Sequence, residues 1–217
     1  VEYIDMKYLF TTLTEALMQY VGEGNSSGIT FVESETKEEF LSYGEVFKKA
    51  RFVLFNLQKK GLQPGDEVVF QFQFEKNFVI LFWACILGKI LPVPVTISKT
   101  GELKCLSIWK FLRNPYIVTD YADFYRLLDS SEILGNSPGI KNRVIFFDSL
   151  DDINEMGVPL KSKPGDIAFI QFSSGSTGHP KGVVNTHHAL MNNIRDISAV
   201  LRLSESDKFL SWMPLTH

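Results

Sequence analysis

The residues from Ser173 to Gly182, SSGSTGHPKG, have the side chains and the backbone freedom that phosphate binding requires. Three glycines allow backbone N–H groups to approach an anion closely, and four hydroxyl side chains can donate hydrogen bonds to its oxygens. Lys181 adds a mobile positive charge. A hairpin turn rich in serine and glycine is the alternative, but such turns usually have about two to five residues and need no lysine. The segment therefore predicts a phosphate-binding loop.

Two better-known loop motifs do not fit this segment. Counted from Gly175, Pro180 stands where a Walker loop requires its second glycine. Phe172 stands where a nucleophile elbow, G-x-S-x-G, requires the glycine before Ser174. A Walker loop also opens a helix, whereas residues 183–185 have the pattern of a strand. The sequence therefore predicts a strand, a phosphate-binding loop and a second strand.

Strand and helix signals alternate along the chain that must position this loop. Apolar residues at a period near 3.6 predict helices, and alternating or β-branched runs predict strands. Ser42, with Glu45 three residues later, has the spacing of a capping box at the start of one helix. We expect helices over residues 8–21, 42–61, 78–87, 103–112, 121–128 and from about 188, and strands over residues 29–32, 40–41, 68–74, 93–95, 116–119, 144–147, 167–172 and from 183. This order predicts an α/β fold, a layered and mostly parallel sheet with flanking helices.

The composition excludes several classes of protein. Hydrophobic residues at 45% and charged residues at 22% of the 217 residues are ordinary globular values, unlike those of a disordered, collagen-like or coiled-coil chain. A net charge of −3 with scattered basic residues argues against nucleic acid as a partner. Cys85 and Cys105 lack the spacing of a metal or redox motif, so we expect reduced core thiols in a cytoplasmic protein. The acidic, mixed start VEYID does not have the pattern of a signal peptide.

We assign no chemistry to four further features. The apolar run over residues 78–87 is shorter than the roughly 20 residues that cross a bilayer, so we expect a buried helix and no membrane span. The acidic residues between Asp148 and Glu155 lack the spacing of a calcium loop and are expected to form a solvated turn. His187 and His188 are expected to begin a helix rather than to bind zinc. The loop over residues 130–142 is the candidate for a subdomain seam.

The sequence around the loop resembles the adenylate-forming (AMP-binding) superfamily. SSGSTGHPKG, preceded by DIAFIQF and followed by VVNTHHAL, is similar to the signature loop of that family, which includes acyl-CoA synthetases, luciferases, nonribosomal peptide synthetase adenylation domains and fatty acyl-AMP ligases. Weaker blocks occur in the family's order: LSYGEVFKKA from Leu41, the segment Phe82 to Val95 with its ILGKILPVPV, and FLSWMPLTH from Phe209. The last of these is most similar to fatty acyl-AMP ligases and to the loading modules of polyketide–peptide assembly lines.

The resemblance implies ATP-dependent activation of a carboxylic acid, fatty or other acyl, to an acyl-AMP with release of pyrophosphate. It implies His217 as a catalytic residue beside the acyl carboxylate and the adenylate. The cofactors it implies are ATP and Mg²⁺, with the metal ligand outside this chain. The residues that it implies for holding the phosphates are Ser173, Ser174, Gly175, Ser176, Thr177, Gly178, Lys181 and Gly182.

The resemblance also implies an acceptor for the acyl group. The thiol of a carrier protein's phosphopantetheine, in polyketide or nonribosomal peptide synthesis, is the first expectation, and coenzyme A is the alternative. A non-catalytic nucleotide-binding or docking module is an alternative of another class, and the failed Walker spacing disfavours a hydrolase or kinase. The resemblance covers residues 1–217 as the amino-terminal part of an AMP-binding domain. We therefore expect the rest of the large domain and the small carboxy-terminal domain to lie beyond His217, and this part alone to be nearly inactive.

Overall fold

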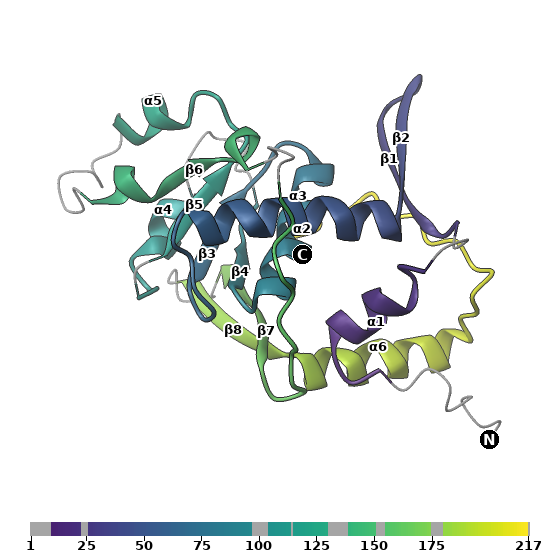
Figure 1. Ribbon diagram of the computed structural model, residues 1–217. Coiled ribbons are helices and arrows are strands. Elements are labelled where there is room, and N and C mark those ends of the chain that lie inside the picture. Colours follow the sequence, from purple (N-terminus) through teal and green to yellow (C-terminus); the bar gives the residue numbers. More distant parts are fainter. Residues whose placement is uncertain are drawn as a thin grey trace.

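The computed structural model describes residues 10–22, 26–96, 104–113, 115–129, 139–150, 155–174 and 180–216 (Figure 1). At its centre is a four-stranded sheet in which every neighbouring pair of strands is parallel. The prediction of an α/β fold with a mostly parallel sheet is therefore confirmed. The order of strands across this sheet is β4 (Leu91–Pro94), β3 (Glu67–Gln71), β5 (Tyr116–Thr119) and β6 (Val144–Phe146).

Helices and two hairpins surround this sheet. The helices are α1 (Leu13–Gln19), α2 (Tyr43–Lys59), α3 (Glu75–Gly88), α4 (Lys104–Trp109), α5 (Phe124–Asp129) and α6 (His187–Leu201), with short 3₁₀ turns at Ile140–Arg143 and Phe147–Ser149. The antiparallel hairpins are β1 (Gly28–Ser34) with β2 (Lys37–Ser42), and β7 (Ile167–Ser174) with β8 (Pro180–Thr186). In Figure 1 the β1–β2 hairpin projects from one end of α2, whereas β7 and β8 lie beside β4 and lead into α6.

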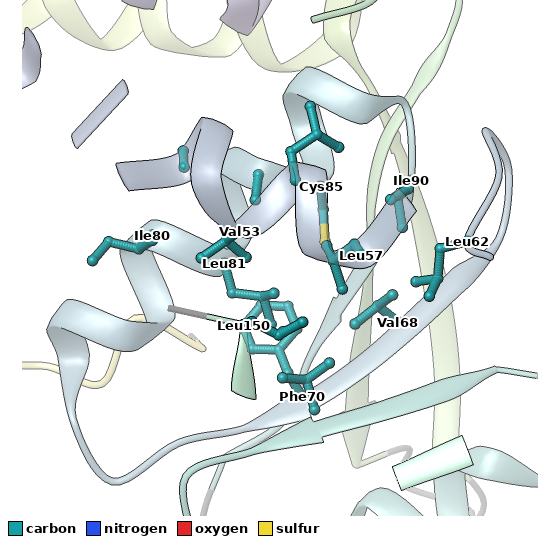
Figure 2. Close-up of a cluster of buried hydrophobic side chains, with 14 of the residues drawn as sticks. Val53, Leu57, Leu62, Val68, Phe70, Ile80, Leu81, Cys85, Ile90 and Leu150 are labelled. Atoms are coloured by element: carbon teal, nitrogen blue, oxygen red, sulfur yellow. The ribbon is translucent and has the colours of Figure 1, made fainter. Parts of the chain in front are cut away.

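The alternation of β3 divides its side chains between two cores. Val68 and Phe70 pack in one cluster with apolar side chains of α2 and α3, and Val69 packs in a second cluster with side chains of α4, α5 and β7. Both faces of the parallel sheet are therefore covered, as such sheets require. Figure 2 shows the first cluster, in which Phe70 lies close to Leu81 and Leu150.

The predicted capping box begins α2. The Ser42 hydroxyl accepts a hydrogen bond from the Glu45 N–H at 3.2 Å, and the Ser42 N–H donates to Glu45 Oε2 at 2.8 Å. Two of the N–H groups that a helix leaves unpaired at its start are thereby satisfied. The carboxylate of Glu45 has a lowered pKa because the Ser42 hydroxyl and N–H both donate to it.

The start of α3 is capped from another strand. Its own N-cap residue, Phe74, makes no side-chain cap, and Asp120, which follows β5, accepts from the N–H groups of Gln73 at 2.8 Å and Phe74 at 3.2 Å. The Asn77 side chain donates to the same carboxylate at 3.0 Å. This capture explains why β3 ends at Gln71, although the alternating pattern continues to Phe74.

Other element boundaries differ slightly from those predicted. Helix α1 begins at Leu13, behind an N-cap at Thr12 whose side chain accepts from the Glu15 N–H, so it is shorter than the expected 8–21. Of the candidate seam over residues 130–142, residues 130–138 lie outside the described residues, and Ile140–Arg143 forms a 3₁₀ turn. The division of the chain into subdomains therefore stays a prediction.

Both cysteines are free thiols in the core, as the sequence predicted. Cys85 on α3 lies in the first cluster, and Cys105 on α4 lies in the second cluster. Burial raises the pKa of both thiols, that of Cys105 to about 12. Neither thiol is therefore ionised near neutral pH. In the described part of the chain, no helix combines the length and apolarity needed to cross a bilayer.

His187 connects the start of α6 to α1. His187 is 2% exposed, and its ring Nδ1 accepts a hydrogen bond from the Leu13 N–H at 3.2 Å. The backbone N–H of His187 donates to the Asp166 carbonyl. An accepting Nδ1 requires the neutral imidazole with its proton on Nε2. Burial lowers the pKa of His187, and the nearby Asp166 carboxylate opposes this only in part. The expectation that His187 begins the helix is confirmed.

We expect the folded chain to lose stability as the pH falls below about 6.5, the ordinary pKa of histidine. Between that value and the lower pKa of the folded state, the unfolded chain binds a proton that the folded chain does not, so the free energy of unfolding decreases with decreasing pH. His187→Asn keeps a hydrogen-bond acceptor but cannot titrate, and its unfolding free energy in urea should change less between about pH 7.5 and pH 5.5.

The matched control is His188→Asn, because His188 is the next residue of the same helix and its side chain is exposed. This variant should keep the pH dependence of the parent protein. Equal pH dependence in His187→Asn and in the parent would contradict the assignment of a neutral, buried imidazole at position 187.

Candidate functional site

The predicted phosphate-binding segment lies between the two strands of the β7–β8 hairpin. In the antiparallel register Ser173 lies opposite Lys181, and Ser174 lies opposite Pro180. The predicted order of strand, loop segment and strand is confirmed, but the predicted bounds of the loop are wrong. β7 continues to Ser174 and β8 begins at Pro180, so Ser173, Ser174, Lys181 and Gly182 lie in the strands. Residues 175–179 lie outside the described residues, and with them lie four of the predicted site residues, Gly175, Ser176, Thr177 and Gly178.

Ser173 and Lys181 form the described base of the site. Residues that lie directly opposite in an antiparallel pair project from the same face of the ladder, so the hydroxyl and the ammonium group leave the hairpin on one side. Both residues are exposed. Among the described residues, no carboxylate lies within ion-pair distance of the Lys181 ammonium group. This cation is therefore available to an anionic ligand.

Gly182 has a packing role in addition to its predicted one. It pairs with Phe172 across the hairpin, and a Cβ atom at position 182 would lie 3.0 Å from Cζ of that ring. The absence of a side chain lets the Phe172 ring lie over the strand and pack against the second core cluster. This contact anchors the base of the hairpin to the parallel sheet.

Four polar residues that the sequence analysis did not single out meet beside this hairpin. Oγ1 of Thr216 lies 2.6 Å from Oγ1 of Thr96, and the Thr216 carbonyl accepts from Nε2 of Gln171 at 3.3 Å. Nε2 of Gln71 donates to the Thr96 carbonyl at 3.4 Å. Gln71 ends β3 and Thr96 follows β4, so this polar cluster lies at the carboxyl edge of the parallel sheet.

That edge is where open α/β sheets bind their ligands. The signal available in the sequence was a polar residue directly at the end of an apolar strand, as at Gln71 after VVF. Such residues are too common for the signal alone to identify a site. Of the other predicted site residues, Ser174 is described only by its backbone, and His217 lies outside the described residues.

The fold and the site together define a class. The parallel sheet has helices on both faces, and the lysine-bearing hairpin lies beside its edge strand β4. Open α/β sheets bind their ligands near the carboxyl ends of their strands. Residues 23–217 match the family described as AMP-binding enzyme, and the chain belongs to this family. The resemblance stated from the sequence is therefore confirmed.

Two curated relatives illustrate the range of the family. The chain is 28% identical over 176 residues to an oxalate–CoA ligase of Arabidopsis thaliana, a match that covers 72% of the chain and 32% of the relative. It is 52% identical over 56 residues to the medium-chain-fatty-acid–[acyl-carrier-protein] ligase TtuA of Teredinibacter turnerae, which covers 26% of the chain and 9% of the relative.

A solved structure shows the same fold over nearly the whole chain. The structure of McyG A-PCP complexed with phenylalanyl-adenylate superimposes with a TM-score of 0.83 at 30% identity, and the match covers 95% of this chain and 33% of that chain. The chain thus spans about a third of the length of such relatives. Ligases and adenylate-forming enzymes are the class of enzyme to which it is similar.

Proposed function

We propose that this chain is part of an enzyme that activates a carboxylic acid with ATP to an acyl-AMP, releases pyrophosphate and passes the acyl group to a thiol. One observation carries the proposal: in a member of the AMP-binding family, the strand register sets Ser173 and Lys181 side by side at the base of the predicted phosphate-binding segment. A cation and a hydroxyl on one face are suited to the terminal phosphates of ATP.

The proposed first step brings two anions together. A carboxylate oxygen attacks the α-phosphorus of ATP, the bond from that phosphorus to the bridging oxygen breaks, and pyrophosphate leaves with the bonding electrons. The protein must therefore offset the charge repulsion and align the carboxylate with the leaving group. In the second step a thiolate attacks the acyl carbon, and AMP leaves.

We assign the phosphate contacts to the hydroxyls of Ser173, Ser174, Ser176 and Thr177 and to the ammonium group of Lys181, with backbone N–H groups around Gly175, Gly178 and Gly182. Hydrogen bonds from these groups would strengthen as charge accumulates on the departing pyrophosphate. We assign His217, which lies outside the described residues, a place beside the carboxylate and the adenylate, as the resemblance to the family implies.

Mg²⁺ would neutralise phosphate charge as pyrophosphate departs. Within the described ranges, no three His, Cys, Asp or Glu side chains are grouped so that they could hold a metal ion. We assign no step of the reaction to Mg²⁺ here.

For the acceptor we propose the phosphopantetheine thiol of a carrier protein. The name of the Teredinibacter relative, a ligase of fatty acids to acyl-carrier protein, supports this choice, and it is the relative with the higher identity of the two, over a short match. The name of the Arabidopsis relative, a CoA ligase, supports coenzyme A as the second candidate.

The test is carboxylate-dependent ATP–pyrophosphate exchange by the full-length protein with fatty, aryl and amino acids. We expect exchange with one class of acid. The activated acid is then offered to coenzyme A and, separately, to a carrier protein bearing phosphopantetheine, and each thioester is identified by mass spectrometry. No exchange with any acid, from a folded protein that still binds ATP, would favour a non-catalytic binding module, and a CoA thioester alone would reverse the order of the two acceptors.

A further inference from the structure

The segment that follows α6 has little regular structure and returns to the sheet at its end. Residues 204–216 form neither a helix nor a strand. Figure 1 shows this segment, in yellow, leaving the far end of α6 and running back toward the sheet. In the described part of the chain, the hydrogen bonds that join residues 204–216 to other elements all involve Thr216. The hydrogen-bonded attachment of this segment to the sheet is therefore made through one residue.

Thr96, one of the two partners of Thr216, is held in place by the parallel sheet. It follows β4, and the N–H of Val95, the residue before it, donates to the Phe70 carbonyl of β3 at 2.9 Å. Nε2 of Gln71 donates to the Thr96 carbonyl at 3.4 Å. The Gln71 carbonyl in turn accepts from the buried hydroxyl of Thr119 on β5 at 3.0 Å. The backbone of Thr96 is therefore fixed from β3, β4 and β5, and its side chain can act as a rigid support.

Thr216 is held from two sides. Its Oγ1 lies 2.6 Å from Oγ1 of Thr96, which is within the range of a hydrogen bond between hydroxyls. Its carbonyl accepts from Nε2 of Gln171 on β7 at 3.3 Å. A threonine side chain has few rotamers, so a hydrogen bond to its hydroxyl also restricts its backbone. Thr96 and Gln171 together therefore connect Thr216 to the parallel sheet and to the β7–β8 hairpin.

Gln171 lies on the face of the hairpin that bears Ser173 and Lys181. Residues two apart on a strand share a face, and Ser173 lies directly opposite Lys181. Two residues of strand span roughly 7 Å. Thr216, bound by Gln171, therefore lies over this face and next to the position of a ligand held by Ser173 and Lys181.

We propose that Thr96 is a positioning residue of the site that activates the acid: its hydroxyl fixes Thr216 and so holds the end of the segment 204–216 over the face of the β7–β8 hairpin that bears Ser173 and Lys181. The inference rests on the proposed function, because it concerns the geometry of that site. A misplacement of about 1 Å can cost a factor of about 100 in rate. The fraction of molecules in which the segment is in place therefore limits kcat, although Thr96 itself need touch neither substrate.

The first test measures kcat and KM for ATP–pyrophosphate exchange by the full-length protein, with the acid that supports exchange best. Thr96→Val keeps the branched shape but lacks the hydroxyl, and it should lower kcat about fivefold, the usual effect of one hydrogen bond on an equilibrium. The KM for ATP should stay within about twofold, because the phosphate contacts come from the hairpin itself. Thr96→Ser restores the hydroxyl and should return kcat to within about twofold of the parent.

A double-mutant cycle tests whether the two threonines act through each other. Thr216→Val should lower kcat by the same factor as Thr96→Val, and the variant with both substitutions should be no slower than either. Thr14→Val is the matched control, because Thr14 is also half-buried and its Oγ1 lies 3.4 Å from Oγ of Ser162, a residue distant in the sequence. Ser162 precedes β7 at the opposite end from Ser173, so this variant should leave kcat within about twofold of the parent.

A crosslink tests the contact without the reaction. Because the two hydroxyl oxygens are 2.6 Å apart, sulfur atoms in their place can reach the disulfide bond length of about 2.05 Å with a small adjustment. In Thr96→Cys/Thr216→Cys, oxidised glutathione takes up the two electrons and two protons of the thiols and becomes two molecules of glutathione, and the disulfide is identified by mass spectrometry of proteolytic peptides. Cys85 and Cys105 are buried and should stay reduced. The crosslinked protein should exchange within about threefold of the parent, and reduction with dithiothreitol should then lower kcat about fivefold.

The outcomes separate this inference from the proposed function. If no acid supports exchange, the proposed function fails, while a disulfide between positions 96 and 216 would still show that Thr96 holds Thr216 in place. If the parent exchanges but Thr96→Val stays within about twofold of it, or Thr96→Ser is as slow as Thr96→Val, Thr96 does not position the site. A crosslinked protein that cannot exchange, although its reduced form can, also overturns the inference, because the segment would then have to leave the hairpin during the reaction.

Discussion

Replacing Lys181 by alanine in the full-length protein should lower the rate of carboxylate-dependent ATP–pyrophosphate exchange about 100- to 1,000-fold, the usual cost of removing one preorganised group that stabilises developing charge. The charge on pyrophosphate grows as its bond to the α-phosphorus breaks, so the loss of a cation should reduce kcat more than it raises the KM for ATP. Steady-state kinetics of the exchange, with ATP and acid varied in turn, would measure both effects.

The control is Lys163→Ala. Lys163 is also an exposed lysine next to the hairpin, but it precedes β7 at the opposite end from the phosphate-binding segment. Its removal should leave the exchange within about twofold of the parent, since exposed charges far from a site contribute little. Exchange by Lys181→Ala within about threefold of the parent would show that Lys181 does not contact the phosphates.

Local rules were sufficient to predict most of the elements. The capping box at Ser42 predicted the start of α2, and the run of aromatic and β-branched residues Tyr116–Thr119 coincides with β5. Both signals are local. The capping box is a hydrogen-bond pattern within four residues, and the strand signal is a short run of residues that favour strands. The alternation of VVFQF in β3 also predicted a strand, and the two cores on its faces give the physical reason.

Long-range contacts explain where the predictions were incomplete. The end of β3 at Gln71 depends on Asp120, which lies 49 residues later and captures the N–H groups of Gln73 and Phe74. The hydrogen bond from Gln171 to the Thr216 carbonyl is also a long-range contact. Nothing in the sequence next to either residue indicates that the two meet. A pattern confined to one segment cannot contain a partner that only the folded chain provides.

The candidate site also has one part that local sequence predicts and one part that depends on long-range pairing. Its loop was found from composition, because three glycines, four hydroxyls and a lysine in ten residues are distinctive. The register that sets Ser173 opposite Lys181 could not be found in that way, because it depends on the pairing of the whole hairpin.

Phe70→Ala should lower the free energy of unfolding by about 3–5 kcal/mol, the usual cost of removing a buried aromatic side chain. Phe70 is fully buried in the centre of the sheet, paired with Pro94 of β4 and Val118 of β5, and its ring meets that of Phe78 edge-on at 5.0 Å between centroids. α2 and α3 pack against it from one side, as Figure 2 shows, so the space left by the ring cannot close without moving both helices.

Urea unfolding followed by tryptophan fluorescence would measure this change, because Trp83 packs against the same cluster. Phe40→Ala, at a site 51% exposed, is the control and should cost less than about 1 kcal/mol, since little apolar surface is lost there. Phe70→Leu should fall between the two because it keeps most of the buried volume. If Phe70→Ala and Phe40→Ala were equally stable, the cluster between α2, α3 and β3 would not be the core that holds the sheet in place.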